Sequence, residues 1–286
     1  MVFVGINNGL WEKPSRHRER STMATIYKAY KFFVTSIIAC NTFDGVVLSA
    51  DTGYISEESG LHSGVGKITC LTVEDRPIAY VAMAGDEDAI NRLSKALQRV
   101  ITKIKEPVIE HGPSEFPGII RNYINRRIIK NIGNNIKNDV EIAMIYGFKF
   151  KGSTIYRNAI GFRVYKHSEE WKVELEGTSI SEGPRRMCIF AGSVKRQLGD
   201  LYTLLEGESF LSNLQYSIKF IGFLQFLVAN FGSSTKYFEV AYITDKGETN
   251  MYPANHPAIR NMVNYYRQLY DSIKKEILNT PLDLKL

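Results

Sequence analysis

The chain has few residues of the kinds that make covalent cross-links or bind metal ions. Its 286 residues include three cysteines and five histidines. Cys40, Cys70 and Cys188 are odd in number, far apart and set in apolar, strand-like segments, so they are predicted to be reduced core residues of a cytosolic protein. Cys40 lies inside a predicted strand, which disfavours it as a nucleophile. The histidines form no metal-like pair and no serine-type triad, so the sequence predicts neither a metal nor a cofactor.

Long hydrophobic runs are also missing. The most apolar stretch, residues 218–228, is interrupted by Lys219 and Gln225. It is much shorter than the roughly 20 apolar residues that cross a bilayer, and it is better interpreted as a buried helix. The amino-terminal segment has no uninterrupted apolar region of a secretory signal. We therefore expect a cytoplasmic protein that does not bind membranes.

Excess acidic charge is absent, and the basic charge is concentrated at one end. The net charge is +6, of which residues 1–34 contribute +4 through six basic and two acidic side chains. A nucleic-acid-binding protein would present such charge on a recognisable folded module, and the chain contains none. Residues 1–34 are therefore predicted to be a basic leader or propeptide. Met23 is an alternative to Met1 as the start.

The informative feature is an evenly spaced set of three polar residues. Thr35 begins a strand-like run, Asp51 follows sixteen residues later and Lys67 sixteen after that. A threonine hydroxyl needs a base to become a nucleophile. Its own α-amine, with a pKa of about 8, can serve when the bond after Val34 has been cut. A lysine ammonium would favour the deprotonated hydroxyl and amine, and an aspartate would hold that lysine in place.

The segment around these residues indicates a hairpin. Two short apolar runs, 36–40 and 46–50, are joined by a turn that contains Asp44-Gly45, a strong hairpin signal. The hairpin would bring Asp51 back beside Thr35. The alternative, that Asp51 and Lys67 are ordinary ion-pair or surface residues, remains open on spacing alone.

Four segments in order carry a resemblance to a known family. They are residues 35–39 (TSIIA), 45–51 (GVVLSAD), 66–68 (GKI) and 82–85 (AMAG). The chain resembles the proteasome β-subunit family and the HslV-type peptidases, which have an amino-terminal threonine nucleophile. The resemblance covers residues 35–252. It implies that the Gly85 amide stabilises the oxyanion, although a glycine required only by a tight strand-to-helix turn explains the same residue.

The resemblance also implies two supporting hydroxyls, from Ser193 and Ser234. Three positions depart from the family pattern. Phe231 stands where the family has an aspartate, Val194 where it has a glycine that can take positive φ, and Val34 where self-processing members usually have glycine. These departures bear on processing and activity more than on the fold.

The predicted elements do not alternate as strand and helix. They fit the α+β fold that the resemblance implies, a four-layer αββα sandwich of two antiparallel sheets between helical layers, the N-terminal nucleophile hydrolase fold. Residues 253–286 form a predicted helical extension that either caps a neighbour or packs on its own domain. Strands are predicted at 35–50, 54–70, 77–84, 138–148, 153–163, 170–176, 187–191 and 236–244, and helices at 86–106, 115–136, 195–206 and 212–230.

The resulting hypothesis is a threonine-type endopeptidase that hydrolyses peptide bonds of proteins after removal of residues 1–34. The resemblance implies a ring-forming oligomer, built from copies of this chain or from related α- and β-type subunits, with a possible unfolding ATPase as a partner. One alternative is a catalytically silent, unprocessed structural subunit. Another is an amide hydrolase or transpeptidase with a single substrate.

Overall fold

The structure of the protein, a computed structural model, describes residues 35–56, 60–63, 66–111, 115–129, 139–149, 155–168, 170–176, 187–230 and 237–279. All of them belong to one compact unit, Phe33–Leu286. The predicted leader lies outside the described residues, so its role stays a prediction.

Two five-stranded sheets, both antiparallel throughout, form the centre of this unit. The first has the order β10-β1-β2-β11-β12 and the second β5-β6-β7-β8-β9. A separate hairpin is formed by β3 (Gly53–Ser56) and β4 (Gly60–Ser63). In sequence it follows the first two strands of the first sheet and precedes the second sheet. The strands of the first sheet are β10 (Met187–Ala191), β1 (Ile37–Asn41), β2 (Gly45–Asp51), β11 (Phe238–Thr244) and β12 (Thr249–Tyr252). Those of the second are β5 (Ile68–Val73), β6 (Arg76–Ala84), β7 (Val140–Lys149), β8 (Ile155–His167) and β9 (Glu170–Glu176).

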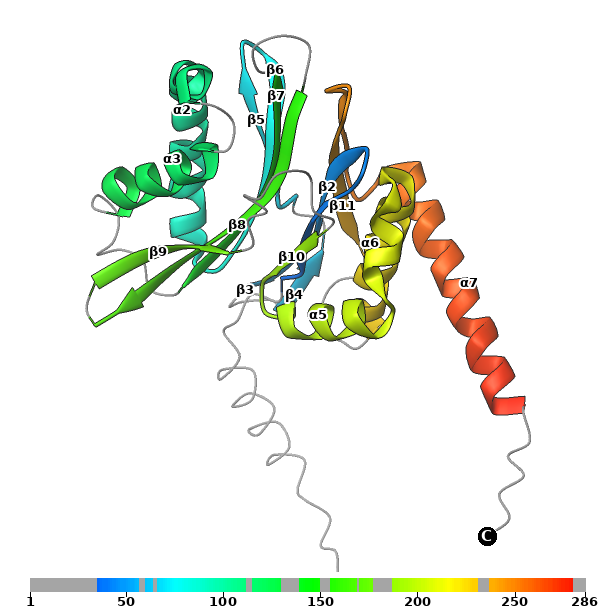
Figure 1. Cartoon of the computed structure of the whole chain (residues 1–286). Coiled ribbons are helices and arrows are strands. Elements are labelled where there is room, and N and C mark those ends of the chain that lie inside the picture. The colour runs from blue at the N-terminus through cyan, green and yellow to red at the C-terminus, as the bar shows by residue number, and fades with distance from the viewer. Residues whose placement is uncertain are drawn as a thin grey trace, which may run out of the picture. The chain divides into compact units, whose positions relative to one another are not determined.

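Helices cover the outer face of each sheet (Figure 1). On the second sheet lie α2 (Glu87–His111) and α3 (Phe116–Tyr123), which continues into a π-helical turn, Ile124–Ile129. The first sheet is covered by α5 (Lys195–Leu204), a 3₁₀ turn (Gly207–Ser212), α6 (Leu214–Asn230) and α7 (Pro257–Asn279). The α+β prediction of two antiparallel sheets between helical layers is therefore confirmed.

Alanines are frequent in the layer between the two sheets, where they lie among larger apolar side chains. Ala39 and Ala241 come from the first sheet, and Ala82, Ala143 and Ala159 from the second. Small residues let two sheets approach closely, and the alternate positions of each strand point outward to the helices. This explains why every residue of β2 is buried although the strand has two faces.

Local sequence accounts for the helices. In α2, Leu93, Leu97, Val100 and Ile101 form the buried stripe expected of an amphipathic helix. Asp86 precedes it and accepts a hydrogen bond from Ala89 N at 3.0 Å, which satisfies an amide that the first turn leaves free.

The carboxy-terminal helix packs on its own domain, one of the two possibilities left open by the sequence. Ile259, Val263 and Tyr266 of α7 are buried in the same core cluster as α6. The Tyr266 hydroxyl donates a hydrogen bond to the carbonyl of Lys219. Within the described residues, no helix has the length and apolarity that crossing a membrane requires.

The cysteine prediction was wrong for two of the three residues. Cys40 on β1 and Cys188 on β10 are paired in the strand register and are joined by a disulfide, and Cys70 is free. Residues 148 apart in sequence become neighbours because β10 pairs with β1, which no spacing rule reveals. Disulfides are typical of oxidising compartments, so the cysteines no longer support a cytosolic location.

We expect alkylation with iodoacetamide under denaturing, non-reducing conditions to modify one cysteine, and three after reduction, because the disulfide protects two of them. Intact mass spectrometry counts the adducts. A Cys188→Ser variant is the control and should show two adducts without reduction. Three adducts on the unreduced wild-type protein would contradict the disulfide.

Candidate active site

The β1–β2 hairpin positions the first two candidate residues. Ile37 pairs with Ala50, so Thr35 and Ser36, just before β1, lie beside the end of β2. The amide of Ser36 donates a hydrogen bond to Asp51 Oδ1 at 3.0 Å. At the turn, the amide of Thr42 donates to the carbonyl of Gly45 at 2.9 Å. The return of Asp51 toward Thr35, predicted from the Asp-Gly turn, is confirmed.

Lys67 links the other two residues. Its Nζ lies 3.0 Å from Thr35 Oγ1 and 2.8 Å from Asp51 Oδ1. The side chain of Asp51 is fully buried and that of Lys67 is 13% exposed. The structure thus brings the three residues together in the interior. The interpretation of Asp51 and Lys67 as surface residues is wrong.

Burial and neighbouring charges act in opposite directions on the pKa of Lys67. Burial lowers the pKa of its ammonium group, because removal from water disfavours the charged form. The charge and hydrogen bond of Asp51 act in the opposite direction, as does the charge of Glu239. Burial is the larger effect, so the pKa of Lys67 lies below its ordinary value.

The backbone nitrogen of Thr35 contacts Ser193, for which the resemblance implied a supporting role that stays a prediction. Its N–H donates to Ser193 Oγ at 3.1 Å, because β10 runs antiparallel to β1 and ends beside it. Gly192, just before, has a φ of +93°, and a Cβ built there would lie 2.1 Å from the Thr35 carbonyl oxygen. Only glycine fits this approach.

The expected conflict at Val194 does not arise. Its φ is −106°, within the range that any L-residue adopts, and its side chain is buried. Val194 packs in the core cluster that includes Leu198 of α5. The valine therefore anchors the turn to the helix without opposing its conformation.

Sequence reasoning missed Glu141, which holds the Ser193 turn. Its Oε2 accepts a hydrogen bond from the Gly192 amide at 2.6 Å, and its Oε1 forms an ion pair with Lys195 Nζ. A carboxylate at the start of an otherwise apolar strand was the available signal. Its partners lie in a segment more than fifty residues away, which the sequence does not indicate.

A second buried polar group lies under the hairpin. Gln225 of α6 donates through Nε2 to the carbonyl of Ser36 and to Ser49 Oγ, each at 3.3 Å, and accepts from Ser36 Oγ. The sequence marked Gln225 only as an interruption in an apolar run. Its amide connects α6 to the two strands that carry Thr35 and Asp51.

Gly85 lies at the end of β6, next to the start of α2. Ile68 pairs with Ala82, so the residues after Ala82 run alongside Lys67. The φ angle of Gly85 is +131°, and a Cβ built on Gly85 would lie 2.3 Å from the Asp139 carbonyl oxygen. These constraints explain the glycine by turn geometry. The oxyanion role stays a prediction, and Ser234 and Phe231 lie outside the described residues.

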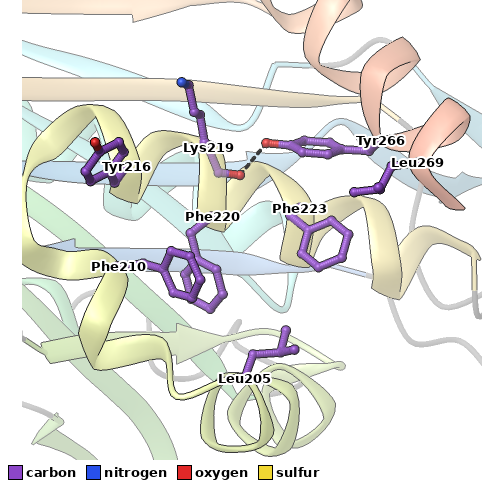
Figure 2. A pocket seen from close by; sticks show the side chains of 8 residues that line it. All are labelled: Leu205, Phe210, Tyr216, Lys219, Phe220, Phe223, Tyr266 and Leu269. Carbon is purple, nitrogen blue, oxygen red and sulfur yellow. Dashed lines mark hydrogen bonds between the residues drawn. The ribbon is translucent and has the colours of Figure 1, made fainter. Parts of the chain in front are cut away.

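The structure also contains an apolar cavity of about 280 Å³ (Figure 2). The side chains that line it come from the helical layer over the first sheet, and none belongs to the Thr35 site. Its lining residues are Leu205, Phe210, Tyr216, Lys219, Phe220, Phe223, Tyr266 and Leu269. Among the residues that the structure describes, no group of histidine, cysteine or carboxylate side chains is arranged to hold a metal ion.

Thr35 itself is 2% exposed in the intact chain. Its nitrogen belongs to a peptide bond there, so the lone pair is delocalised and cannot accept a proton. An α-amine exists at Thr35 only if the bond after Val34 is cut.

Comparisons with solved structures show what the fold resembles. The chain is similar to Anbu (ancestral beta-subunit) from Yersinia bercovieri, at 14% identity over 87% of this chain and 99% of that one, with a TM-score of 0.56. It is also similar to two Anbu structures from Hyphomicrobium sp. strain MC1. One is described as a Gly-1 mutant, at 13% identity over 87% and 98% of the two chains, with a TM-score of 0.54. The other has 11% identity over 87% and 99%, with a TM-score of 0.55.

No model of a known protein family matches the chain, and no curated protein does. The family assignment made from the sequence, to proteasome β subunits and HslV-type peptidases, is therefore corrected. The similar structures are Anbu proteins, a proteasome-like group, and identities of 11–14% show the fold alone. The chain has a proteasome-like β-subunit fold, an α+β sandwich of two antiparallel sheets with flanking helices.

Proposed function

We propose that this chain is a threonine-type endopeptidase whose nucleophile is Thr35 after removal of residues 1–34. The observation that carries the proposal is the position of Lys67 Nζ, within hydrogen-bond distance of both Thr35 Oγ1 and Asp51 Oδ1 in a buried site. A charged donor beside the hydroxyl stabilises developing negative charge on its oxygen. A purely structural ion pair would not require the threonine hydroxyl as a third member.

The mechanism follows from these contacts. Cleavage after Val34 would convert the Thr35 nitrogen into an α-amine, held near Ser193 Oγ as the amide is in the intact chain. The amine accepts the hydroxyl proton while Oγ1 attacks the substrate carbonyl carbon. The proton then passes to the leaving amine as the peptide bond breaks, and an acyl-enzyme ester remains. Water hydrolyses the ester with the same amine as base.

The other predicted residues take supporting roles in this proposal. Asp51 keeps Lys67 charged and oriented, and Ser193 orients the amine. The Gly85 amide stabilises the oxyanion, and Ser234 supports the amine as a second hydroxyl. No metal ion or cofactor takes part in the steps as written.

The substrates would be peptide bonds of proteins, and the assembly a ring-forming oligomer of this chain or of related α- and β-type subunits. The description of a similar structure as an ancestral beta-subunit supports a subunit of a larger assembly. An ATPase that unfolds substrates would then deliver them to enclosed sites. Hydrolysis of a panel of short peptides would separate broad endopeptidase activity from a single-substrate amide hydrolase or transpeptidase.

A second candidate function is a silent structural subunit that keeps its leader. Val34 favours it, because a β-branched residue crowds the carbonyl that self-cleavage must attack. With the leader in place the Thr35 nitrogen stays an amide and cannot act as the base. Processing decides between the two candidates.

We expect intact mass spectrometry of the purified wild-type protein to show loss of residues 1–34, because the proposed base exists only at a free amino terminus. Edman sequencing should then begin at Thr35. A Thr35→Ala variant should retain the leader if the chain cleaves itself. A wild-type chain that keeps the leader and still hydrolyses peptides would rule out the amino-terminal mechanism.

Thr35→Ala should reduce peptide hydrolysis at least about 10,000-fold, since removal of a nucleophile eliminates the covalent pathway. Both proteins should be made with a removable amino-terminal fusion that leaves residue 35 first, so that processing is not a variable. Circular dichroism checks the fold. Thr35→Ser is the matched control and should retain measurable activity because it keeps the hydroxyl.

The activity of the processed enzyme should depend on pH in a bell shape. It should rise as the Thr35 amine loses its proton, with a midpoint below its ordinary pKa of about 8 because the Lys67 charge is near. It should fall as Lys67 loses its proton, below the ordinary lysine pKa of about 10.4, because burial lowers the pKa of Lys67. The profile of kcat/KM measures both limbs. An active Lys67→Arg enzyme should lack the alkaline limb, and a wild-type rate that still rises at pH 11 would contradict the role of Lys67.

A further inference from the structure

A second buried carboxylate, besides that of Asp51, lies near Lys67. Glu239 of β11 is 5% exposed, between Phe238 and Val240 in an otherwise apolar strand. Its Oε2 accepts hydrogen bonds from the amides of Lys67 at 3.0 Å and Ile68 at 3.1 Å. One oxygen thus holds two consecutive backbone groups at the start of β5.

These hydrogen bonds join the two sheets at the site. β11 belongs to the first sheet, beside β2, and Phe238 pairs with Asp51. β5 is the edge strand of the second sheet and begins directly after Lys67. Glu239 therefore spans the layer between the sheets at the point where Lys67 must reach back to the first sheet.

The neighbouring residue is shaped to accept this carboxylate. A Cβ built on Gly66 would lie 2.9 Å from Glu239 Oε1. Any larger residue would press on the carboxylate and displace it. The Gly66-Lys67 pair singled out in the sequence thus has a physical reason in Glu239.

Burial of this carboxylate has a cost that its contacts offset. Burial raises the pKa of Glu239, while the two backbone hydrogen bonds and the charge of Lys67 act against that rise. A buried acceptor with two amide donors and a nearby cation is satisfied in both hydrogen bonding and charge. Its removal would leave two buried amides without their acceptor.

We propose that Glu239 is a positioning residue for the Thr35 site: its carboxylate fixes the backbone at Lys67 and Ile68, so that Lys67 Nζ contacts both Thr35 Oγ1 and Asp51 Oδ1. This inference rests on the proposed function for its catalytic meaning. The placement of Lys67 that it describes is independent of whether the chain is processed.

The charge of Glu239 has a second effect, on the protonation of Lys67. Within the described residues, the groups that face the Lys67 ammonium are Asp51 from β2, Glu239 from β11 and the hydroxyl of Thr35 before β1. Both carboxylates favour the charged lysine. Loss of the Glu239 charge removes one of the two carboxylates that oppose the effect of burial, so the pKa of Lys67 should fall.

Glu239→Gln separates charge from shape, because the amide oxygen of glutamine still accepts from both backbone amides. Glu239→Asp keeps the charge but withdraws it by one methylene. Glu248→Gln is the matched control: Glu248 is exposed in the turn between β11 and β12 and is part of no proposed site.

The experiment is an NMR titration of the full-length chain labelled with [¹³Cε]lysine, with the Lys67 signal assigned by its loss in Lys67→Met. We expect a measurable shift of the Lys67 midpoint to lower pH in Glu239→Gln, because a carboxylate that favours the charged lysine is lost. The shift in Glu239→Asp should be smaller, and Glu248→Gln should match the wild type. A Lys67 midpoint unchanged in both Glu239 variants would overturn the inference. If Glu239→Gln does not fold, by circular dichroism, Glu239→Asp alone decides.

This titration distinguishes the two proposals. A Lys67 midpoint that is lowered in both Glu239 variants, in a chain that is never processed and hydrolyses nothing, would support the positioning role and sink the endopeptidase. A processed, active enzyme in which the Glu239 variants leave both the Lys67 midpoint and the alkaline limb of kcat/KM unchanged would support the endopeptidase and overturn the positioning role of Glu239.

Discussion

The pairing of β1 with a strand on each side is the constraint on which the site depends. β2 on one side ends at Asp51, and β10 on the other ends beside Ser193, while Thr35 stands immediately before β1. Hydrogen bonding between antiparallel strands leaves little freedom along the strand direction, because a slip of one residue would turn every buried side chain to the wrong face. The hydroxyl and the nitrogen of Thr35 are therefore placed by the register of three strands.

That register does not by itself bring in Lys67, which belongs to the other sheet. The approach of the two sheets does so, across a layer in which alanines such as Ala39, Ala82 and Ala241 lie among larger apolar side chains. Larger side chains in place of these alanines would separate the sheets and carry Lys67 away from Asp51. A buried ion pair is stable only with good geometry and further hydrogen bonds, and the amide of Ser36 supplies one of these at Asp51 Oδ1.

Much of the fold was predictable because local patterns decide it. The Asp44-Gly45 turn indicated the hairpin, the apolar spacing of α2 indicated a helix, and the grouping of strands and helices indicated a sandwich. Thr35, Asp51 and Lys67 were found because their spacing and context are local to one segment. Glu141, Gln225 and Glu239 were not found, because each stands in a largely apolar element and its partners are distant in sequence. The family assignment failed for a related reason: short motifs that follow the backbone of a fold do not separate groups that share it.

The sequence by itself determined the hairpin, the grouping of strands and helices and the identity of the three central polar residues, since turn chemistry and hydrophobic periodicity act over a few residues. The tertiary structure alone decided that Cys40 and Cys188 are bonded, that Val194 needs no unusual backbone conformation, and that Glu239 holds the backbone at Lys67. These features arise where strands from distant parts of the chain pair or where two sheets pack. Such contacts depend on which strands become neighbours in space, and short-range sequence patterns carry little information about that choice.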